Sequence, residues 1–139
     1  MKLSTLLPAT LLALITGLSG CASMSGKSDN ERVEQRATEQ MNAFLAKDYP
    51  KALTYMTPGY QQTRQLYGFG ADFACLVDMV DFTITGSQCQ EDRCEVSVTR
   101  KQKMPGFVTG GDVNPDKFTF NASTKRVWVR TKGKWYHYK

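Results

Sequence analysis

The chain has 139 residues, of which 41% are hydrophobic and 22% are charged, and its formal net charge is +5 at pH 7. This composition is typical of a globular domain and excludes a wholly disordered chain, while the length leaves room for one hydrophobic core and not two. The charge is uneven, because residues 21–93 hold seven Lys and Arg against ten Asp and Glu, whereas residues 94–139 hold ten against three. The basic C-terminal third is either the solvated face of a sheet or a surface for an acidic partner.

The first 21 residues have the pattern of a bacterial export signal. Lys2 supplies a positive charge, a mainly apolar run extends from Leu6 to Ile15, and small residues precede a cysteine in Leu18-Ser19-Gly20-Cys21. The run is shorter than the roughly 20 apolar residues that span a bilayer, so it predicts a cleaved signal peptide over 1–20. Its ending resembles the lipobox of bacterial lipoproteins, which implies that Cys21 is acylated. The alternative is an ordinary secretory signal in which this cysteine is incidental.

A lipidated Cys21 predicts that acyl chains hold the domain at a membrane. Each buried methylene contributes about 0.8 kcal/mol, so several chains together anchor a protein stably. Ala22 follows Cys21, where the enteric sorting rule associates Asp with the inner membrane. We therefore expect an outer-membrane lipoprotein that faces the periplasm. The partner expected there is an envelope protein or an anionic envelope polymer, and nucleic acid is not expected.

A helix is predicted directly after the anchor. Residues 21–29 form the expected lipidated tether and residues 30–139 the expected single domain. Ser28-Asp29-Asn30-Glu31 has the pattern of a helix capping box. Apolar residues follow at helical spacings, namely Val33, Ala37, Met41, Phe44 and Leu45. We expect an amphipathic helix over about 30–47, with charged side chains on its solvated face.

A second, short helix is predicted from Asp48-Tyr49-Pro50, because proline is favoured in a first helical turn. Thr57-Pro58-Gly59 is expected to end it. From Tyr60 to Ala74 the periodicity weakens, while aromatic residues and glycines accumulate. We predict an irregular segment here, with one helical turn at most, that lies across an open sheet.

Two alternating segments, Val77–Thr85 and Cys94–Lys103, predict a β-hairpin. Their apolar faces disagree by one residue when the strands are paired across a four-residue loop, and a bulge near Gly86 would restore the register. An exported protein tends to oxidise its cysteines, and hairpin geometry brings Cys89 and Cys94 within disulfide distance. Cys75 is expected to be a buried free thiol. No CxxC pattern occurs and the chain has a single histidine, so no metal site, cofactor or catalytic cysteine is expected.

The segment 104–117 is rich in proline and glycine and is predicted to be a long loop. Two further strands are expected, at 118–122 and 126–131. The apolar side chains switch parity between Phe118 and Phe120 in the first and Val127 and Val129 in the second. This switch predicts a bulge or turn within 121–125.

The last predicted hairpin turns at Lys132-Gly133. Its pairing is Arg130 with Trp135, Val129 with Tyr136, Trp128 with His137 and Val127 with Tyr138. One face, predicted to be core, holds Val127, Val129, Tyr136 and Tyr138. The other interleaves cations with indoles and holds Arg126, Trp128, Arg130, Trp135, His137 and Lys139. An arginine beside a tryptophan gains about 0.5–1 kcal/mol by cation–π contact.

The face with both indoles has three interpretations. It is a flat binding platform for a sugar polymer or an anionic partner, made of Arg126, Trp128, Arg130 and Trp135. Alternatively, it is an outer face that only stabilises itself, or its tryptophan rings line a concave pocket. We take these four residues as the binding candidates.

The order of elements resembles the NTF2-like superfamily, also called cystatin-like, which includes ketosteroid isomerase-like and SnoaL-like proteins. The resemblance rests on the helix-to-helix passage Ala43–Leu53 and on the closing strands from Val127 to Tyr136. It implies an α+β fold in which N-terminal helices pack on a curved antiparallel sheet, forming a cone with an apolar pocket. Such cones hold enzymes as well as non-catalytic modules, so the fold alone does not select a function.

An isomerase-like site would need a carboxylate base that faces the pocket and a buried hydrogen-bond donor. Asp78 shares its predicted parity with Val80, Phe82 and Ile84, and Tyr55 or Tyr60 would supply the donor. A second buried acid is not evident, so no catalytic residue is assigned. We expect a non-catalytic binding or assembly module. The alternatives are a pocket enzyme or a carrier of small apolar ligands, and an accessory subunit of an envelope complex.

Overall fold

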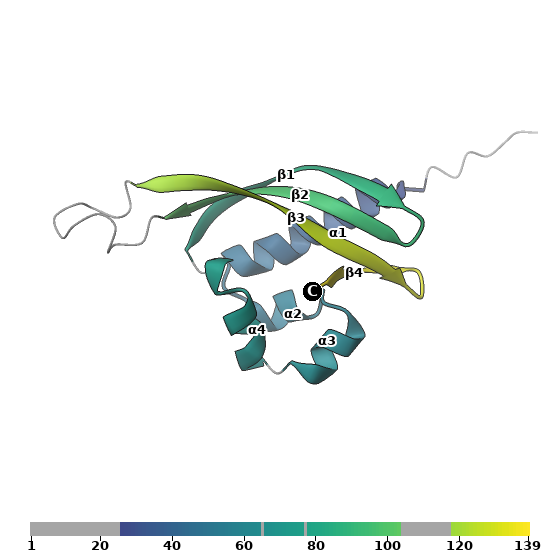
Figure 1. The fold of residues 1–139 in the computed structure, drawn as a ribbon, viewed down its shortest axis with the longest axis horizontal. Coiled ribbons are helices and arrows are strands. Elements are labelled where there is room, and N and C mark those ends of the chain that lie inside the picture. The colour runs from purple at the N-terminus through teal and green to yellow at the C-terminus, as the bar shows by residue number, and fades with distance from the viewer. Residues whose placement is uncertain (1–25, 65, 77, 104–117) are drawn as a thin grey trace, which may run out of the picture.

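The computed structural model describes residues 26–64, 66–76, 78–103 and 118–139. The predicted signal peptide, Cys21 and the predicted loop at 104–117 lie outside these residues. The described elements form one α+β unit in which helices lie on one side of a curved sheet (Figure 1). Within the described ranges, no helix combines the length and the apolar character needed to cross a membrane.

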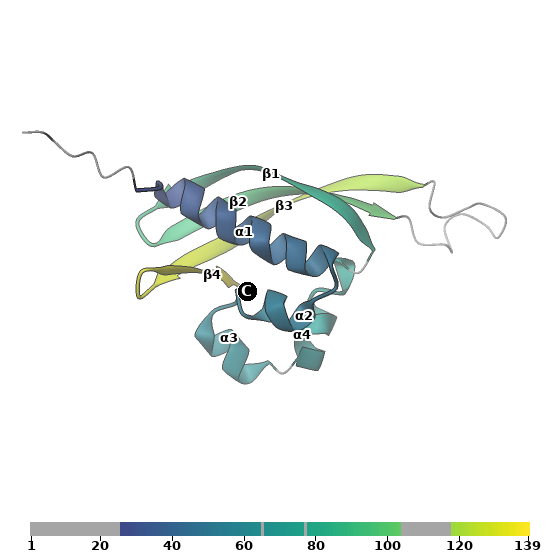
Figure 2. The same ribbon diagram turned by 180° about the vertical axis from the view of Figure 1, so that it is seen from behind.

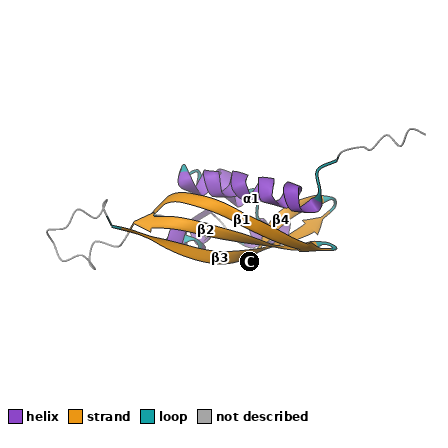
Figure 3. Cartoon of the chain, turned by 90° about the horizontal axis from the view of Figure 1, so that it is seen from above, coloured by secondary structure: helices purple, strands orange, loops and turns teal. Residues whose placement is uncertain are grey.

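The first helix, α1 (Asp29–Leu45), is confirmed together with its start signal. The Ser28 hydroxyl accepts the Glu31 amide, and the Glu31 carboxylate accepts the Ser28 amide, which completes the capping box. One stripe of the helix is buried and includes Val33, Ala37, Met41 and Phe44. Figures 2 and 3 show that α1 lies along one face of the sheet.

The segment after α1 is more helical than predicted. The second helix, α2 (Tyr49–Leu53), is confirmed, with Asp48 as its N-cap. Thr57, expected to end that helix, instead caps a third one, α3 (Pro58–Thr63). Helix α4 (Leu66–Asp72) and a 3-10 turn (Ala74–Leu76) follow, so the prediction of an irregular segment was wrong. Thr57-Pro58 repeats the start signal of Asp48-Tyr49-Pro50, because each places a capping side chain just before a proline in the first turn.

The sheet has four antiparallel strands in the order β1-β2-β3-β4. The first hairpin consists of β1 (Met79–Gln90) and β2 (Arg93–Lys103), and its register shifts between Ile84 and Gly86. This confirms the bulge predicted near Gly86, whose φ is +146°. Cys89 and Cys94 are directly paired and form the predicted disulfide.

Strand β3 (Thr119–Thr131) is continuous, so the bulge or turn expected within 121–125 is wrong. Its pairing with β2 runs without interruption from Arg93 opposite Val129 to Lys103 opposite Thr119. The parity does not switch, because the buried positions near its end are Arg126 and Trp128 and not Val127 and Val129.

Strand β4 (Lys134–Tyr138) is an edge strand of the sheet. It pairs with β3 as predicted, from Arg130 with Trp135 to Val127 with Tyr138. Lys132 and Gly133 both have positive φ, at +50° and +76°, as the tight turn requires. The strand also joins the helical layer, because the His137 amide donates to the Tyr55 carbonyl at 2.8 Å. The site described below sits where this strand meets α4.

The core contradicts the predicted orientation of the last hairpin. Trp128 is fully buried and Trp135 is 2% exposed, whereas Tyr138, expected in the core, is 56% exposed. The indole face therefore packs against α1, and the flat exposed platform predicted from Arg126, Trp128, Arg130 and Trp135 is not formed. The indoles are the largest side chains of this hairpin, and their burial removes a large apolar area from water.

Candidate functional site

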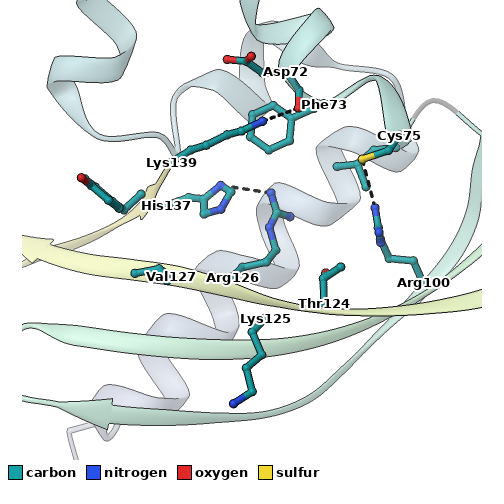
Figure 4. Close-up of a pocket in the computed structure, with 12 residues that line it drawn as sticks. Asp72, Phe73, Cys75, Arg100, Thr124, Lys125, Arg126, Val127, His137 and Lys139 are labelled. Atoms are coloured by element: carbon teal, nitrogen blue, oxygen red, sulfur yellow. Dashed lines mark hydrogen bonds between the residues drawn. The ribbon is translucent and has the colours of Figure 1, made fainter.

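A cavity of about 300 Å³ opens beside β3, between the sheet and the end of α4 (Figure 4). Its lining comes from α4 and the turn after it, from β2 and from the strands at the C-terminus. Four cationic residues line it, Arg100, Lys125, Arg126 and Lys139, of which Lys125 directs its side chain away from the cavity, toward Glu95 (Figure 4). Phe73, Leu76, Val127 and Tyr138 supply the apolar part. The apolar cone pocket implied by the family resemblance is thus a mixed one, in which the charged residues are mainly basic.

Arg126 is placed in the cavity by its inward position on β3, two residues before Trp128. The residue is 8% exposed. Its Nη1 donates to Met41 Sδ at 2.6 Å and its Nη2 donates to His137 Nδ1 at 3.2 Å. Burial lowers the pKa of Arg126 to about 9, and repulsion from Arg100 acts in the same direction. The charged guanidinium is therefore held where the fold disfavours its charge.

Arg100 lies on β2 and is also 8% exposed. It follows Val96 and Val98 on the inward face of the strand. Its Nη1 lies 3.6 Å from Cys75 Sγ, and within the described ranges its buried Nε has no hydrogen-bond partner. Within the part of the chain that the structure describes, neither Arg100 nor Arg126 forms an ion pair with a carboxylate. As far as the described residues go, the pair is thus a buried positive charge without a carboxylate counter-charge.

His137 supports Arg126 from β4. Its ring stacks on Trp128 at 5.5 Å between centroids and lies 5.7 Å from Phe73. Burial, then the charges of Arg126 and Lys139, hold the pKa of His137 well below its usual value. Because a guanidinium only donates, Nδ1 accepts the bond from Arg126 and the proton of the neutral imidazole is on Nε2. His137 therefore orients Arg126 and adds no charge at neutral pH.

The rim of the cavity holds one carboxylate, that of Asp72. Its Oδ2 accepts the Tyr60 hydroxyl at 2.5 Å, and Arg64 Nε lies 3.7 Å from the same oxygen. The Tyr60 bond keeps the pKa of Asp72 below its usual value. Lys139 donates to the Asp72 carbonyl and lies 4.4 Å from the Phe73 ring centroid. Asp72 is therefore a poor proton acceptor at neutral pH.

The four predicted binding residues separate into different environments. Arg126 lines the cavity, whereas Trp128 and Trp135 are buried core residues. Arg130 lies toward the turn of the last hairpin, where it bonds to Asp29 at 3.0 Å and to Asp92 at 2.7 Å. Its guanidinium carbon is 5.2 Å from the centroid of the Trp135 ring, as the predicted cation–π pair requires.

The predicted pocket trio does not converge. Asp78 is exposed in a turn just before β1, and the irregular pairing between Met79 and Asp81 removes the expected parity. The Tyr55 hydroxyl donates to Glu39 at 3.1 Å on the helical side. The Tyr60 hydroxyl donates to Asp72. The structure thus does not bring the two tyrosines and Asp78 together as an isomerase-like site.

Sequence reasoning missed Arg100, Cys75 and His137 as cavity residues. Arg100 carried a usable signal, because it continues the inward parity of Val96 and Val98. Cys75 was expected to be buried but is an exposed free thiol. No set of three His, Cys, Asp or Glu side chains arranged to hold a metal ion occurs among the described residues.

Comparisons with known proteins identify the architecture. No family model matches the sequence. No curated protein gives a significant match. Among solved structures, the chain is similar to a SEC-C motif-containing protein from Psychrobacter arcticus, with a TM-score of 0.58 and 11% identity. That match covers 83% of this chain and 63% of the other. A second SEC-C motif protein, RPA3114 from Rhodopseudomonas palustris, has a TM-score of 0.55 and 14% identity over 76% and 74% of the two chains.

The chain is also similar to an NTF2-like transpeptidase from Campylobacter jejuni. The TM-score is 0.54 and the identity 13%, over 77% of this chain and 97% of that one. At such low identity the likeness shows the fold alone. The chain therefore has the α+β architecture of an NTF2-like domain, with helices packed on a curved antiparallel sheet.

Proposed function

We propose that this chain is a lipid-anchored outer-membrane lipoprotein whose periplasmic domain is a non-catalytic binding module for an anionic group. The anchor follows from the lipobox-like ending at Cys21. The binding role is supported by one observation above all, the buried pair Arg100 and Arg126 at a cavity of about 300 Å³ without a carboxylate partner among the described residues.

The energetics of burial support this assignment. A buried charge without a partner lowers stability, and it persists in proteins where a ligand or partner supplies the counter-charge. Both guanidiniums present donors in a planar fork that suits carboxylate or phosphate. Apolar groups line the same cavity, with Phe73 and Leu76 among them, so we propose a small anion with an apolar portion.

The chemistry of the cavity favours binding over catalysis. Proton abstraction requires a group whose pKa is near the working pH. Asp72 has a lowered pKa and is hydrogen-bonded to Tyr60. In neutral His137, the nitrogen that could accept a proton is Nδ1, and it already accepts the hydrogen bond from Arg126. Neither group offers a base directed at a ligand, so we propose no acid–base catalysis.

The first test measures binding by the full-length lipoprotein, extracted in detergent, with benzoate and inorganic phosphate as probes. A ligand at 100 times its Kd stabilises a protein by about 2.7 kcal/mol, so each probe should raise the thermal midpoint. Arg126→Met should weaken benzoate binding tenfold or more, because a hydrogen bond to a charged group contributes about 1.5–3 kcal/mol. Lys101→Gln is the matched control, since Lys101 is the exposed neighbour of Arg100 on β2.

Stability without ligand gives an independent test of the same assignment. If Arg126 is kept for binding, Arg126→Met should leave the free energy of unfolding unchanged or raise it, by up to about 4 kcal/mol. A fall in stability of several kcal/mol would identify Arg126 as a structural residue and contradict the proposal. Equal benzoate binding by the wild type and Arg126→Met would contradict it as well.

A further inference from the structure

The rim of the cationic cavity carries a thiol, that of Cys75. The residue is exposed and lies in the 3-10 turn Ala74–Leu76. Gln102 donates its side-chain amide to the Cys75 carbonyl, which ties this turn to β2. Figure 4 shows the Cys75 side chain and the Arg100 guanidinium directed toward one another, and Sγ lies 3.6 Å from Nη1.

A second observation points to a ligand at this thiol. Arg100 is more than nine-tenths buried, and its Nε has no hydrogen-bond partner among the residues that the structure describes. Arg126 contributes a second buried guanidinium to the same cavity. An anionic group that enters beside Cys75 would therefore meet two guanidiniums that are already desolvated.

Cys75 is also the thiol that remains available. Cys89 and Cys94 are joined in a disulfide, so Cys75 is the one free cysteine in the part of the chain that the structure describes. Reactive thiols are accessible and lie near cations, and Cys75 meets both conditions.

We propose that Cys75 is a site of thiol–disulfide exchange, selective for small disulfides that carry carboxylates. The proposal rests on the proposed function, because Arg100 and Arg126 would hold the carboxylates. In the step, Cys75 loses its proton to solvent, and its sulfur attacks one sulfur of the incoming disulfide. The S–S bond of the reagent breaks, a bond from Cys75 Sγ forms, and the released thiolate takes a proton from solvent. The product is Cys75 in a mixed disulfide whose carboxylates face the two arginines.

The test compares three disulfides of different charge on the full-length lipoprotein in detergent. Oxidised glutathione is anionic, 2-hydroxyethyl disulfide is neutral and cystamine is cationic. The rate constant of Cys75→Ser is subtracted from each rate constant as the background. The result is divided by the rate constant of the same protein unfolded in urea, which removes the intrinsic reactivity of each disulfide. We expect oxidised glutathione to exceed cystamine at least tenfold on this scale. The ratio should fall in 1 M NaCl, because salt screens charge attraction. Mass spectrometry should place the adduct on Cys75.

Matched variants assign the selectivity to the cavity. Arg100→Gln should remove most of the preference for the anionic disulfide, and Arg100→Lys should retain part of it. Lys101→Gln makes the same change of charge on the outer face of β2 and should keep the wild-type ratio. The Cys89–Cys94 disulfide stays intact in all variants, which can be checked by counting thiols.

Three results would overturn the proposal: a Cys75 that does not react, equal rates for the three disulfides, or a ratio that Arg100→Gln leaves unchanged. The benzoate assay on Cys75→Ser separates this failure from failure of the proposed function. If Cys75→Ser binds benzoate while the wild-type thiol shows no charge preference, only the exchange site is refuted. If the wild-type protein itself does not bind benzoate, the binding role is refuted.

Discussion

At the scale of single residues, the cavity depends on neighbours that tune charge. Arg126 carries a charge that burial disfavours, and His137 beside it stays neutral for the same reason. The Arg126 to His137 hydrogen bond fixes the imidazole tautomer and the direction of the guanidinium. A protonated His137 would place a second positive charge against Arg126, so the folded state resists that protonation.

This resistance predicts a pH dependence of stability. The pKa of His137 lies well below 6.5 in the folded protein and near 6.5 in the unfolded chain. As the pH falls below 6.5 the unfolded state binds a proton that the folded state does not, so stability decreases, by up to about 1.4 kcal/mol per pH unit. His137→Gln should remove this slope between pH 6.5 and 5. Urea unfolding at several pH values measures it, and parallel curves for the two proteins would contradict the prediction.

At the scale of elements, local signals were sufficient where one short segment determines the structure. The capping box of α1 and the Lys132-Gly133 turn were predicted with the correct residues. Local signals failed where tertiary packing decides, because the last hairpin has two faces that both hold aromatic rings. Only the burial of Trp128 and Trp135 against α1 settles which face is inward. Thr57-Pro58 was misread as a stop, although it has the chemistry of a start.

The bulge in β1 gives the prediction at this scale. Gly86 has a φ of +146°, a conformation that L side chains rarely adopt, while its neighbourhood leaves open space for a Cβ. Gly86→Ala should therefore destabilise the fold by strain and not by collision, by about 1–3 kcal/mol. Gly59→Ala in α3 is the control, because its Cβ also meets open space without positive φ and should be neutral or slightly stabilising. Equal stability of the two variants, measured by thermal unfolding, would contradict the role of the bulge.

At the scale of the whole molecule, the cavity joins segments that are distant in sequence. Cys75, Arg100, Arg126 and His137 come from four different elements. None of the four has a local sequence pattern that indicates a site. The register of β2, β3 and β4 brings the three strand residues together, and the bond from Gln102 holds the turn of Cys75 on β2. The α+β class was predictable because it depends on the order of local elements. The basic cavity was not, because it depends on contacts between elements.

The arrangement also places the cavity relative to the proposed anchor. The N-terminal end of α1 lies at the hairpin turns, where Asp29 pairs with Arg130 and Asn30 donates to the Ser87 carbonyl. Phe44, near the other end of α1, packs against Phe73 at the cavity. A helix of 17 residues is roughly 25 Å long, so the cavity lies well away from the first residue of α1, Asp29. If the proposed anchor is present, this distance would let a periplasmic partner reach the cavity while the acyl chains stay in the membrane.

This separation predicts that anchoring and binding are independent. Cys21→Ser should move the protein from the membrane fraction to the soluble periplasmic fraction, because the acceptor of the acyl chains is removed. The same variant should bind benzoate with unchanged affinity, since residue 21 precedes α1 and the cavity lies at the far end of that helix. Fractionation and the binding assay are carried out on one preparation, with Ser25→Ala as a control that keeps the cysteine. A Cys21→Ser protein that stays in the membrane fraction would show that the anchor is not this cysteine. A released protein that no longer binds benzoate would show that the two ends of the molecule are coupled.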